Sequence, residues 1–348
     1  MKIMKVAIDE IRKRSVDIFE KAGLNSEDAQ IITEVLLETE MRGVFTHGFL
    51  RLERYINCIK SGGIKTNGCY NVLYDSPSWA SIDGGDNLGI VISYKAMKLA
   101  MEKAKQTGVG IVNVKGSHHF GAAGYYTSMC ADNDMVGMSM SNGDILIAAT
   151  GSAEKTIGNN PFSYAFPAGK YSKVVYDIAM SYTSDRKVVQ MDKEGKKLPE
   201  GWIIDKDGNA TTDPGEYEKG GTLLPFGGYK GYGFAMMVET LGATLSGAAM
   251  TKNVHAWNTD DKCGGNVGHF FMALDISKLG SPDAYKQRVD DMIDEIKNSK
   301  KSAGVDTIYY PGEIEMAKMA KCLKEGYVDI DDDTMASVER VEKEFGLR

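Results

Sequence analysis

Apolar positions recur at helical spacing along the first part of the chain. Residues 7–21 and 26–42 both show this period, and Asn25 with Ser26 offers an N-terminal cap to the second segment. A third helix is predicted from Gly48 to Lys60. Three successive helices predict a small helical lobe.

The pattern changes after residue 68, where short runs rich in β-branched and aromatic residues alternate with helical segments. The runs predict strands at 70–74, 79–82, 109–114, 136–140, 174–180 and 266–276. Helices are predicted at 89–107, 121–133 and 231–247. The polar stretch 186–214 is expected to form a surface loop with a short hairpin.

Helical spacing returns at 284–297, 314–323 and 334–345, the last after the acidic run Asp331–Asp333. We expect this tail to pack against the helical start of the chain. The predicted architecture is therefore α/β (α+β), with a helical domain of residues 1–68 and 280–348 and an α/β domain of residues 69–279.

Composition and charge argue against several classes of partner. A net charge of −7 without a long Lys/Arg block disfavours nucleic acid. The N-terminal segment MKIMKVAIDEIRKRS interrupts its apolar residues with charges, so we expect neither a signal peptide nor a membrane span, and a cytoplasmic protein. The cysteines form no C-x-x-C pair, which argues against a disulfide framework or a metal site and favours reduced, mostly buried thiols. They are Cys58, Cys69, Cys130, Cys263 and Cys322.

Several catalytic motifs are absent from the sequence. A strand followed by G-x-G-x-x-G does not occur, which disfavours a standard dinucleotide fold. Walker A, H-E-x-x-H and G-x-S-x-G are also missing. P-loop phosphoryl transfer, zincin chemistry and the hydrolase elbow are therefore disfavoured.

A first polar cluster contains Thr46, His47, Arg51 and Tyr55. On a continuous helix, positions 47, 51 and 55 would share one face. Arginine matches the two oxygens of a carboxylate, and histidine can exchange a proton near neutral pH. The cluster therefore predicts a carboxylate-binding site, and the alternative is a solvated helix face with His47 as a cap.

A second cluster follows the strand at 109–114 and contains His118 and His119 among glycines. A strand that opens into a segment of small residues lets a ligand approach the backbone. Neighbouring side chains in extended chain point opposite ways, so a shared metal is not expected and one histidine should face inward. The alternative is a structural histidine in the core. His255 is expected at the surface, and His269 is expected to be structural.

Two further clusters suit a nucleotide. Lys230 and Gly231 lie in a glycine loop at the start of a predicted helix, where a cation, backbone N–H groups and the helix dipole coincide. A plain turn with a solvated lysine is the alternative. The segment Asn159–Pro161 leads to Asp177, a carboxylate in an apolar strand that needs either a ligand or a partner.

The segments that carry these clusters resemble the malate/L-lactate dehydrogenase family of the non-Rossmann type. They are RGVFTHGFLRLERY, SHHFGAAGYY, IGNNPFSYAFP, LPFGGYKGYGFAMMVE, NVGHFF and YPGEIE. The resemblance implies an NAD(P)-dependent dehydrogenase that interconverts a small 2-hydroxy acid and its 2-oxo acid. It also implies a homodimer with sites near the subunit interface and a non-Rossmann NAD(P)-binding domain whose sheet is largely antiparallel or mixed.

The resemblance assigns roles to individual residues. His119 matches the acid/base histidine, His47 and Arg51 match a substrate pair, and either histidine can be the proton donor. The expected substrate contacts are Arg51, Tyr55 and Thr46. The expected contacts to NAD, or to NADP as the alternative, are His119, Asn142, Asn159, Asn160, Pro161, Asp177, Ile178, Ala179, Lys230, Gly231, Gly312 and Glu313.

Two positions depart from the family pattern. His118 stands where the family has Asn and could compete for the proton role, and Asn159 stands where it has Thr. Asp185 and Arg186 give opposite indications about NAD and NADP. Two alternatives remain open, a reductase of cyclic imines or of diketogulonate type on the same scaffold, and a catalytically silent nucleotide-binding regulator.

Overall fold

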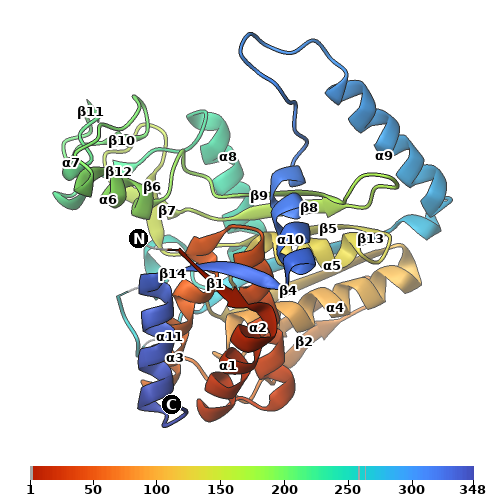
Figure 1. Cartoon of the computed structure of the whole chain (residues 1–348), viewed down its shortest axis with the longest axis horizontal. Helices are drawn as coiled ribbons and strands as arrows, with labels where there is room; N and C mark the ends of the chain where they lie inside the picture. Colours follow the sequence, from red (N-terminus) through yellow and green to blue (C-terminus); the bar gives the residue numbers. More distant parts are fainter. Residues whose placement is uncertain (1–2, 258, 263) are drawn as a thin grey trace.

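The computed structural model describes residues 3–257, 259–262 and 264–348 (Figure 1). Cys263, one of the predicted thiols, lies outside the described residues. The other four cysteines are free, and Cys58 and Cys130 are buried.

The two ends of the chain meet in one helical region at the lower left of Figure 1. Strand β1 (Ile3–Ala7) pairs antiparallel with β14 (Tyr327–Asp331), and helix α11 (Asp332–Glu344) packs on α1 (Ile8–Lys21). The buried guanidinium of Arg14 donates to both carboxylate oxygens of Glu342 at 2.7 Å. The expected contact between tail and head is therefore present, although β1 and β14 were not predicted.

Helix α2 (Ser26–Met41) begins as predicted, because the Asn25 side chain accepts a hydrogen bond from the Asp28 N–H. The predicted helix at 48–60 is wrong at its start. Two 3₁₀ turns, Phe45–His47 and Phe49–Arg51, precede α3 (Leu52–Lys60). Between the two turns, Gly48 adopts φ −88° and ψ −144°, which no helix allows.

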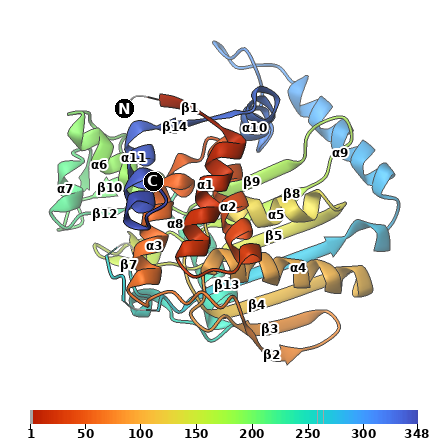
Figure 2. The same cartoon turned by 60° about the horizontal axis from the view of Figure 1, so that its bottom comes forward.

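The main sheet has seven strands in the order β2-β3-β4-β13-β5-β8-β9 (Figure 2). Strands β3 and β4 run parallel, and the other neighbouring pairs run antiparallel. The expected mixed sheet is confirmed. Its strands are β2 (Asn71–Asp75), β3 (Trp79–Asp83), β4 (Val109–Ser117), β5 (Met135–Ser141), β8 (Phe162–Phe166), β9 (Val174–Ile178) and β13 (Val267–Asp275).

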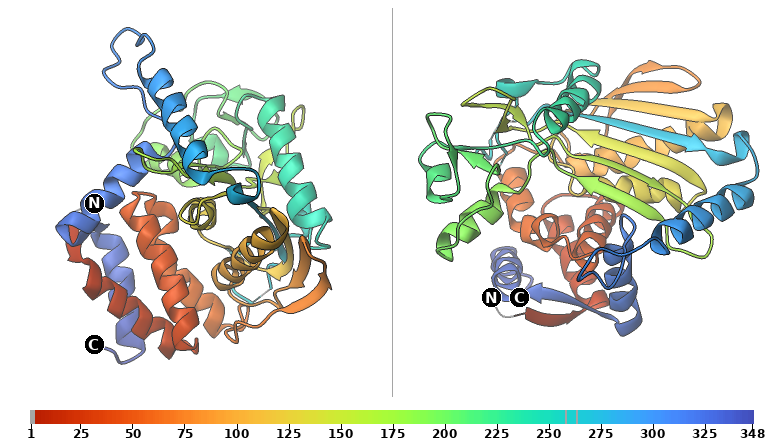
Figure 3. Two further views of the ribbon diagram at one scale, coloured as in Figure 1. Left: turned by 90° about the vertical axis from the view of Figure 1, so that its right-hand side faces the viewer. Right: turned by 90° about the horizontal axis from the view of Figure 1, so that it is seen from above.

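The two faces of this sheet differ. Helices α4 (Gly89–Thr107) and α5 (Ala123–Ala131) cover one face, where Phe271 is fully buried. On the other face, helix α8 (Tyr229–Val238) and the π-helical turn Glu239–Thr244 pack near one end of the strands. The rest of that face is seen directly in the right view of Figure 3.

A smaller sheet lies beside the first, in the order β11-β10-β12-β6-β7. Its strands are β6 (Ile145–Ala148), β7 (Lys155–Gly158), β10 (Ile203–Ile204), β11 (Ala210–Thr211) and β12 (Thr222–Leu223). The predicted hairpin is β10–β11. The predicted loop at 186–214 instead begins with helix α6 (Asp185–Lys193), which the Ser184 side chain caps, and the short α7 (Gly215–Glu218) follows.

Helices α9 (Pro282–Lys297) and α10 (Glu313–Glu325) pack on different parts of the molecule. Helix α10 contacts α2, whereas α9 lies beside the β8–β9 connection, where Asp290 accepts hydrogen bonds from the N–H groups of Gly169 and Lys170. The division into residues 1–68 with 280–348 and 69–279 therefore remains a proposal.

Candidate active site

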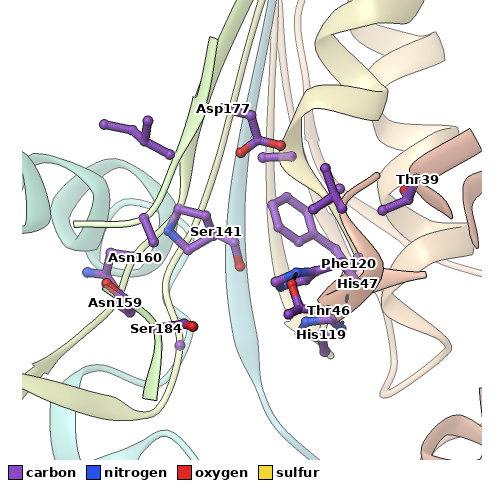
Figure 4. A pocket seen from close by; sticks show the side chains of 18 of the residues that line it. Thr39, Thr46, His47, His119, Phe120, Ser141, Asn159, Asn160, Asp177 and Ser184 are labelled. Carbon is purple, nitrogen blue, oxygen red and sulfur yellow. Dashed lines mark hydrogen bonds between the residues drawn. The ribbon is translucent and has the colours of Figure 1, made fainter. Parts of the chain in front are cut away.

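A cavity of about 490 Å³ lies between the helical region and the ends of the main-sheet strands. Figure 4 shows His47, Thr46 and His119 on one side of it, and Asn159, Asn160 and Ser184 on the other. The predicted site residues that line it are Thr46, His47, Arg51, His119, Asn142, Asn159, Asn160, Pro161, Asp177, Ile178, Ala179 and Gly312. The fold thus gathers most of the predicted site.

His119 is held by two aromatic neighbours. Its Nδ1 lies 2.6 Å from the hydroxyl of buried Tyr55, and its ring stacks on Trp257 at a centroid distance of 4.2 Å. Among the described residues, the Nε2 of His119 has no hydrogen-bond partner, although the residue lines the cavity. Burial, followed by the charges of His47 and Arg51, lowers the pKa of His119 well below its usual value. The imidazole is therefore neutral at pH 7.

The loop that carries Thr46, His47 and Arg51 orients its own side chains. Arg51 Nε donates to the Thr46 carbonyl oxygen at 2.7 Å, and the Thr46 hydroxyl lies 2.9 Å from His47 Nδ1. The rings of His47 and His119 stack at 5.5 Å. Enclosure in the cavity, followed by the charges of Arg51 and Arg186, lowers the pKa of His47 to about 4.

These side chains do not share a helix face as predicted, because Gly48 interrupts the helix. They converge through Trp257, whose ring has the Arg51 guanidinium 5.5 Å from its centroid. Sequence reasoning missed Trp257. No motif or period marks it, and only the fold brings this tryptophan beside His119.

Asp177 stands at the other end of the cavity. Its Oδ2 accepts a hydrogen bond of 2.6 Å from the N–H of Gly124, in the first turn of α5. Although the side chain is exposed to the cavity, the surrounding walls desolvate it and raise its pKa to about 6, against the lowering effects of the Gly124 N–H and of Arg42. The carboxylate thus has a backbone partner and also faces the cavity.

The asparagines of the cavity wall are bound to the protein by their side chains. Asn142 accepts from the Gly268 N–H at 2.8 Å and donates to buried Glu239, and Asn160 donates to the same carboxylate at 2.8 Å. Asn159 accepts from the Ser181 N–H at 2.8 Å. Sequence reasoning missed Glu239, although an acidic residue within the apolar run 234–243 was a usable signal.

Four predicted site residues do not line the cavity within one chain. Tyr55, expected to contact the substrate, is fully buried and bonds to His119 instead. The other three are expected cofactor contacts. Lys230 is exposed at the start of α8, and Gly231 is buried beneath it. The Glu313 carboxylate lies 2.5 Å from the Lys297 ammonium and also accepts from the Tyr310 N–H. Their assignment to the cofactor stays a prediction.

The other histidines have separate environments. His118 is buried, and its Nε2 lies 3.4 Å from the Gly265 N–H. His269 sits between the hydroxyls of Ser117 and Ser141, a structural arrangement, and burial lowers its pKa to about 3. His255 is exposed as expected and lines the cavity.

The chemistry of the cavity fits a dinucleotide. Gly121, Ala122 and Ala123 leave room beside the N-terminus of α5, whose dipole favours a phosphate. A carboxylate such as Asp177 suits a ribose hydroxyl. The fold and site therefore fit a nicotinamide-dependent oxidoreductase, with an arginine and a neutral histidine in its cavity.

Comparison with known proteins gives the family. The sequence profile described as malate/L-lactate dehydrogenase matches residues 6–339. The chain is 39% identical to a malate dehydrogenase of Pyrococcus horikoshii, over 99% of this chain and 96% of that one. It is 36% identical to an L-sulfolactate dehydrogenase of Methanocaldococcus jannaschii, over 97% and 96%.

Solved structures agree. The Pyrococcus horikoshii malate dehydrogenase superposes with a TM-score of 0.90, 36% identity and coverage of 99% of this chain and 96% of that one. The Methanocaldococcus jannaschii sulfolactate dehydrogenase gives 0.92, with 34% identity and coverage of 99% and 98%. The chain belongs to the malate/L-lactate dehydrogenase family. The predicted family, fold class and NAD-dependent dehydrogenase activity are confirmed.

Among the described residues, no helix combines the length and the apolar character that a membrane crossing requires.

Proposed function

We propose that the chain interconverts a small 2-hydroxy acid and its 2-oxo acid, with the carboxylate at Arg51 and the hydroxyl proton exchanged with His119. The single observation that carries this proposal is the geometry of His119. Its Nδ1 is bonded to Tyr55, its Nε2 is left for the cavity, and the Arg51 guanidinium lies over the same Trp257 ring that stacks on the imidazole.

Tyr55 allows His119 to work in both directions. For oxidation, Nε2 must accept the hydroxyl proton, so Nδ1 carries its own hydrogen and donates to the tyrosine oxygen. For reduction, the protonated imidazole gives its Nε2 proton to the carbonyl oxygen and returns to the same neutral form, in which Nδ1–H still donates to the Tyr55 oxygen. Burial raises the pKa of Tyr55, so it stays a phenol that can donate or accept.

His47 polarises the same substrate oxygen. Its Nδ1 is held by the Thr46 hydroxyl, and its low pKa keeps the imidazole uncharged. Thr46 and Tyr55 thus support the substrate site through the two histidines. When bound, NAD supplies the nicotinamide ring that accepts the hydride from C2 of the substrate.

The names of the relatives indicate which 2-oxo acids to test. They are malate, sulfolactate and ureidoglycolate dehydrogenases. The experiment is oxidation of NADH and NADPH with pyruvate, oxaloacetate, sulfopyruvate, oxalurate and diketogulonate. We expect turnover of NADH with at least one 2-oxo acid. NADH binding without turnover on the whole panel would instead identify a silent regulator.

A cyclic-imine reductase is the second candidate. The chain is 29% identical, over 70% of its length, to a reductase of Pseudomonas putida named for Δ1-pyrroline-2-carboxylate and Δ1-piperideine-2-carboxylate. These compounds also carry a carboxylate for Arg51, and their imine nitrogen is the proton acceptor. Adding cyclic imines to the panel separates the two activities, since a 2-hydroxy acid dehydrogenase leaves them unreduced.

We also propose that the protein is a cytoplasmic homodimer. On the face of the main sheet opposite α4 and α5, Met138, Tyr164 and Met272 are only half-buried. Tyr229 and Phe234 on nearby α8 are 69% and 44% exposed, and a subunit interface would remove this apolar surface from water. Analytical ultracentrifugation tests the dimer. Free thiols at the four described cysteines favour a reducing compartment.

A further inference from the structure

Glu40 is a buried carboxyl beneath the loop that carries His47 and Arg51. It lies near the end of α2 and is 2% exposed. Its Oε2 accepts a hydrogen bond of 2.9 Å from the main-chain N–H of Phe49. A Cβ atom built on Gly48 would stand 1.9 Å from the same oxygen. The carboxyl therefore fills the space that any side chain at position 48 would need.

The contact fixes the loop at its centre. The loop is tied to α2 at its start by Val44 N–H, which donates to the Thr39 carbonyl oxygen at 3.1 Å. It is anchored further on by the Phe49 side chain, which is fully buried in the helical core. Between these points, Glu40 holds the Gly48–Phe49 peptide in the break that separates the two 3₁₀ turns. Without an acceptor, the Phe49 N–H would be a buried, unsatisfied donor.

The position of this break decides where the two substrate-binding side chains point. His47 ends the first turn and Arg51 ends the second. If the chain continued as one helix through Gly48, both side chains would change direction relative to His119. Glu40 does not line the cavity, so any effect on the reaction passes through the loop.

The charge state of Glu40 follows from its surroundings. Burial raises the pKa of its carboxyl to about 8, the Phe49 N–H lowers it, and Asp331 at the end of β14 raises it. The charged or titratable side chains of the adjoining segments are Lys318 of α10, which lies over Gly43, and His47 and Arg51 of the loop. At pH 7 the group is mainly a neutral carboxylic acid whose carbonyl oxygen can accept the Phe49 N–H.

We infer that Glu40 is a positioning residue for substrate binding, which holds Gly48 and Phe49 so that His47 and Arg51 converge on the substrate. The inference rests on the proposed role of Arg51 in carboxylate binding. It predicts a specific defect, namely weaker substrate binding with the cofactor site intact.

The first test compares Glu40→Gln and Glu40→Ala with wild type at pH 7. Glutamine keeps an acceptor of the same shape, so we expect KM for the 2-oxo acid within about threefold of wild type. Alanine removes the acceptor, and we expect KM to rise about tenfold or more while the Kd for NADH, followed by fluorescence, changes less than twofold. Glu34→Gln is the matched control, since Glu34 lies on the same helix and pairs with Arg12.

The second test is a double-mutant cycle with Gly48→Ala. In the wild-type background the added methyl group displaces the carboxyl, so KM should rise as in Glu40→Ala. In the Glu40→Ala background the methyl group has space, and we expect little further change. Equal effects in both backgrounds would overturn the inference, because Gly48 would then act without Glu40.

A third measurement uses pH. Ionisation of Glu40 above pH 8 places a charge in a buried site that also feels the charge of Asp331, so KM of wild type should rise between pH 7 and pH 9. Glutamine cannot ionise, and the KM of Glu40→Gln should stay flat. An unchanged KM in Glu40→Ala, or a parallel loss of NADH affinity, contradicts the positioning role. A wild-type enzyme inactive on every 2-oxo acid contradicts the proposed function instead.

Discussion

The cavity has two walls that use polar residues in different ways. On one wall, the proposed catalytic wall, formed by the loop 46–51 with His119 and Trp257, titratable side chains line the cavity and make hydrogen bonds within the wall and to Tyr55 behind it. On the sheet wall, formed by residues 142, 159–161 and 177–179, the polar side chains bond to the protein behind them. Changes in the first wall should affect chemistry and substrate binding, and changes in the second should affect cofactor binding and stability.

The largest effect is expected at His119. Replacement with alanine removes the proton acceptor and should lower kcat about 10²- to 10⁴-fold, with the NADH Kd nearly unchanged. His118→Asn is the matched control, because His118 is buried against Gly265 and does not line the cavity. In wild type, the acid limb of the oxidation rate should lie below pH 6.5, since only neutral imidazole accepts the proton and its pKa is depressed. Equal turnover in His119→Ala would remove this residue from the mechanism.

Arg51→Lys should come next. The charge remains, but the fork of donors that matches a carboxylate is lost, so KM should rise about tenfold or more. Arg54→Lys is the control, because Arg54 also approaches the Trp257 ring but pairs with Asp261 outside the cavity. If the KM of Arg51→Lys equals that of wild type, Arg51 does not bind the substrate carboxylate, and the proposed division of roles between the two walls is contradicted.

Glu239→Gln tests the support of the sheet wall. Its carboxylate accepts from Asn142, Asn160 and the Thr251 N–H, and a neutral amide cannot satisfy all three donors. We expect a loss of about 2 kcal/mol in the free energy of unfolding, measured by denaturant titration. The KM for the 2-oxo acid should change far less than in Arg51→Lys. The opposite order of effects would argue against two distinct walls.

Asp177→Asn should have a moderate effect on cofactor binding. If the ionised carboxylate accepts a hydrogen bond from a ribose hydroxyl, NADH binding by wild type should weaken as the pH falls through about 6. The Kd for NADH should then rise severalfold. Because the folded-state pKa is raised above the ordinary 3.8, the contribution of this group to stability is present below 3.8 and is lost as the pH rises through about 6. Asp177→Asn should remove both pH dependences. An unchanged pH profile would show that another group titrates.

Lys230→Ala should have the smallest effect on stability, within about 0.5 kcal/mol, because the side chain is exposed. The variant is useful because it tests whether Lys230 binds the cofactor. A weaker Kd for NADH would support the family assignment of Lys230 to the cofactor, and an unchanged Kd would remove it from the site.

Sequence periodicity predicted the positions of helices and strands reliably where an element buries a continuous row of apolar side chains. Helices α2, α4 and α9 and strand β4 lie close to their predicted positions. It failed for β1 and β14, which are five residues each and depend on a partner at the other end of the chain. It also failed at Gly48, where a tertiary contact with Glu40 interrupts a helical pattern.

The sequence by itself determined which residue types are available for chemistry. Arg51, His47 and His119 stand in short motifs whose residues are near one another in the chain, so their pattern could be interpreted directly. Only the tertiary structure decided the partners, because Tyr55, Trp257 and Glu239 act across long sequence separations. Hydrogen bonds and desolvation depend on distance in space, and the order of residues along a chain does not encode that distance.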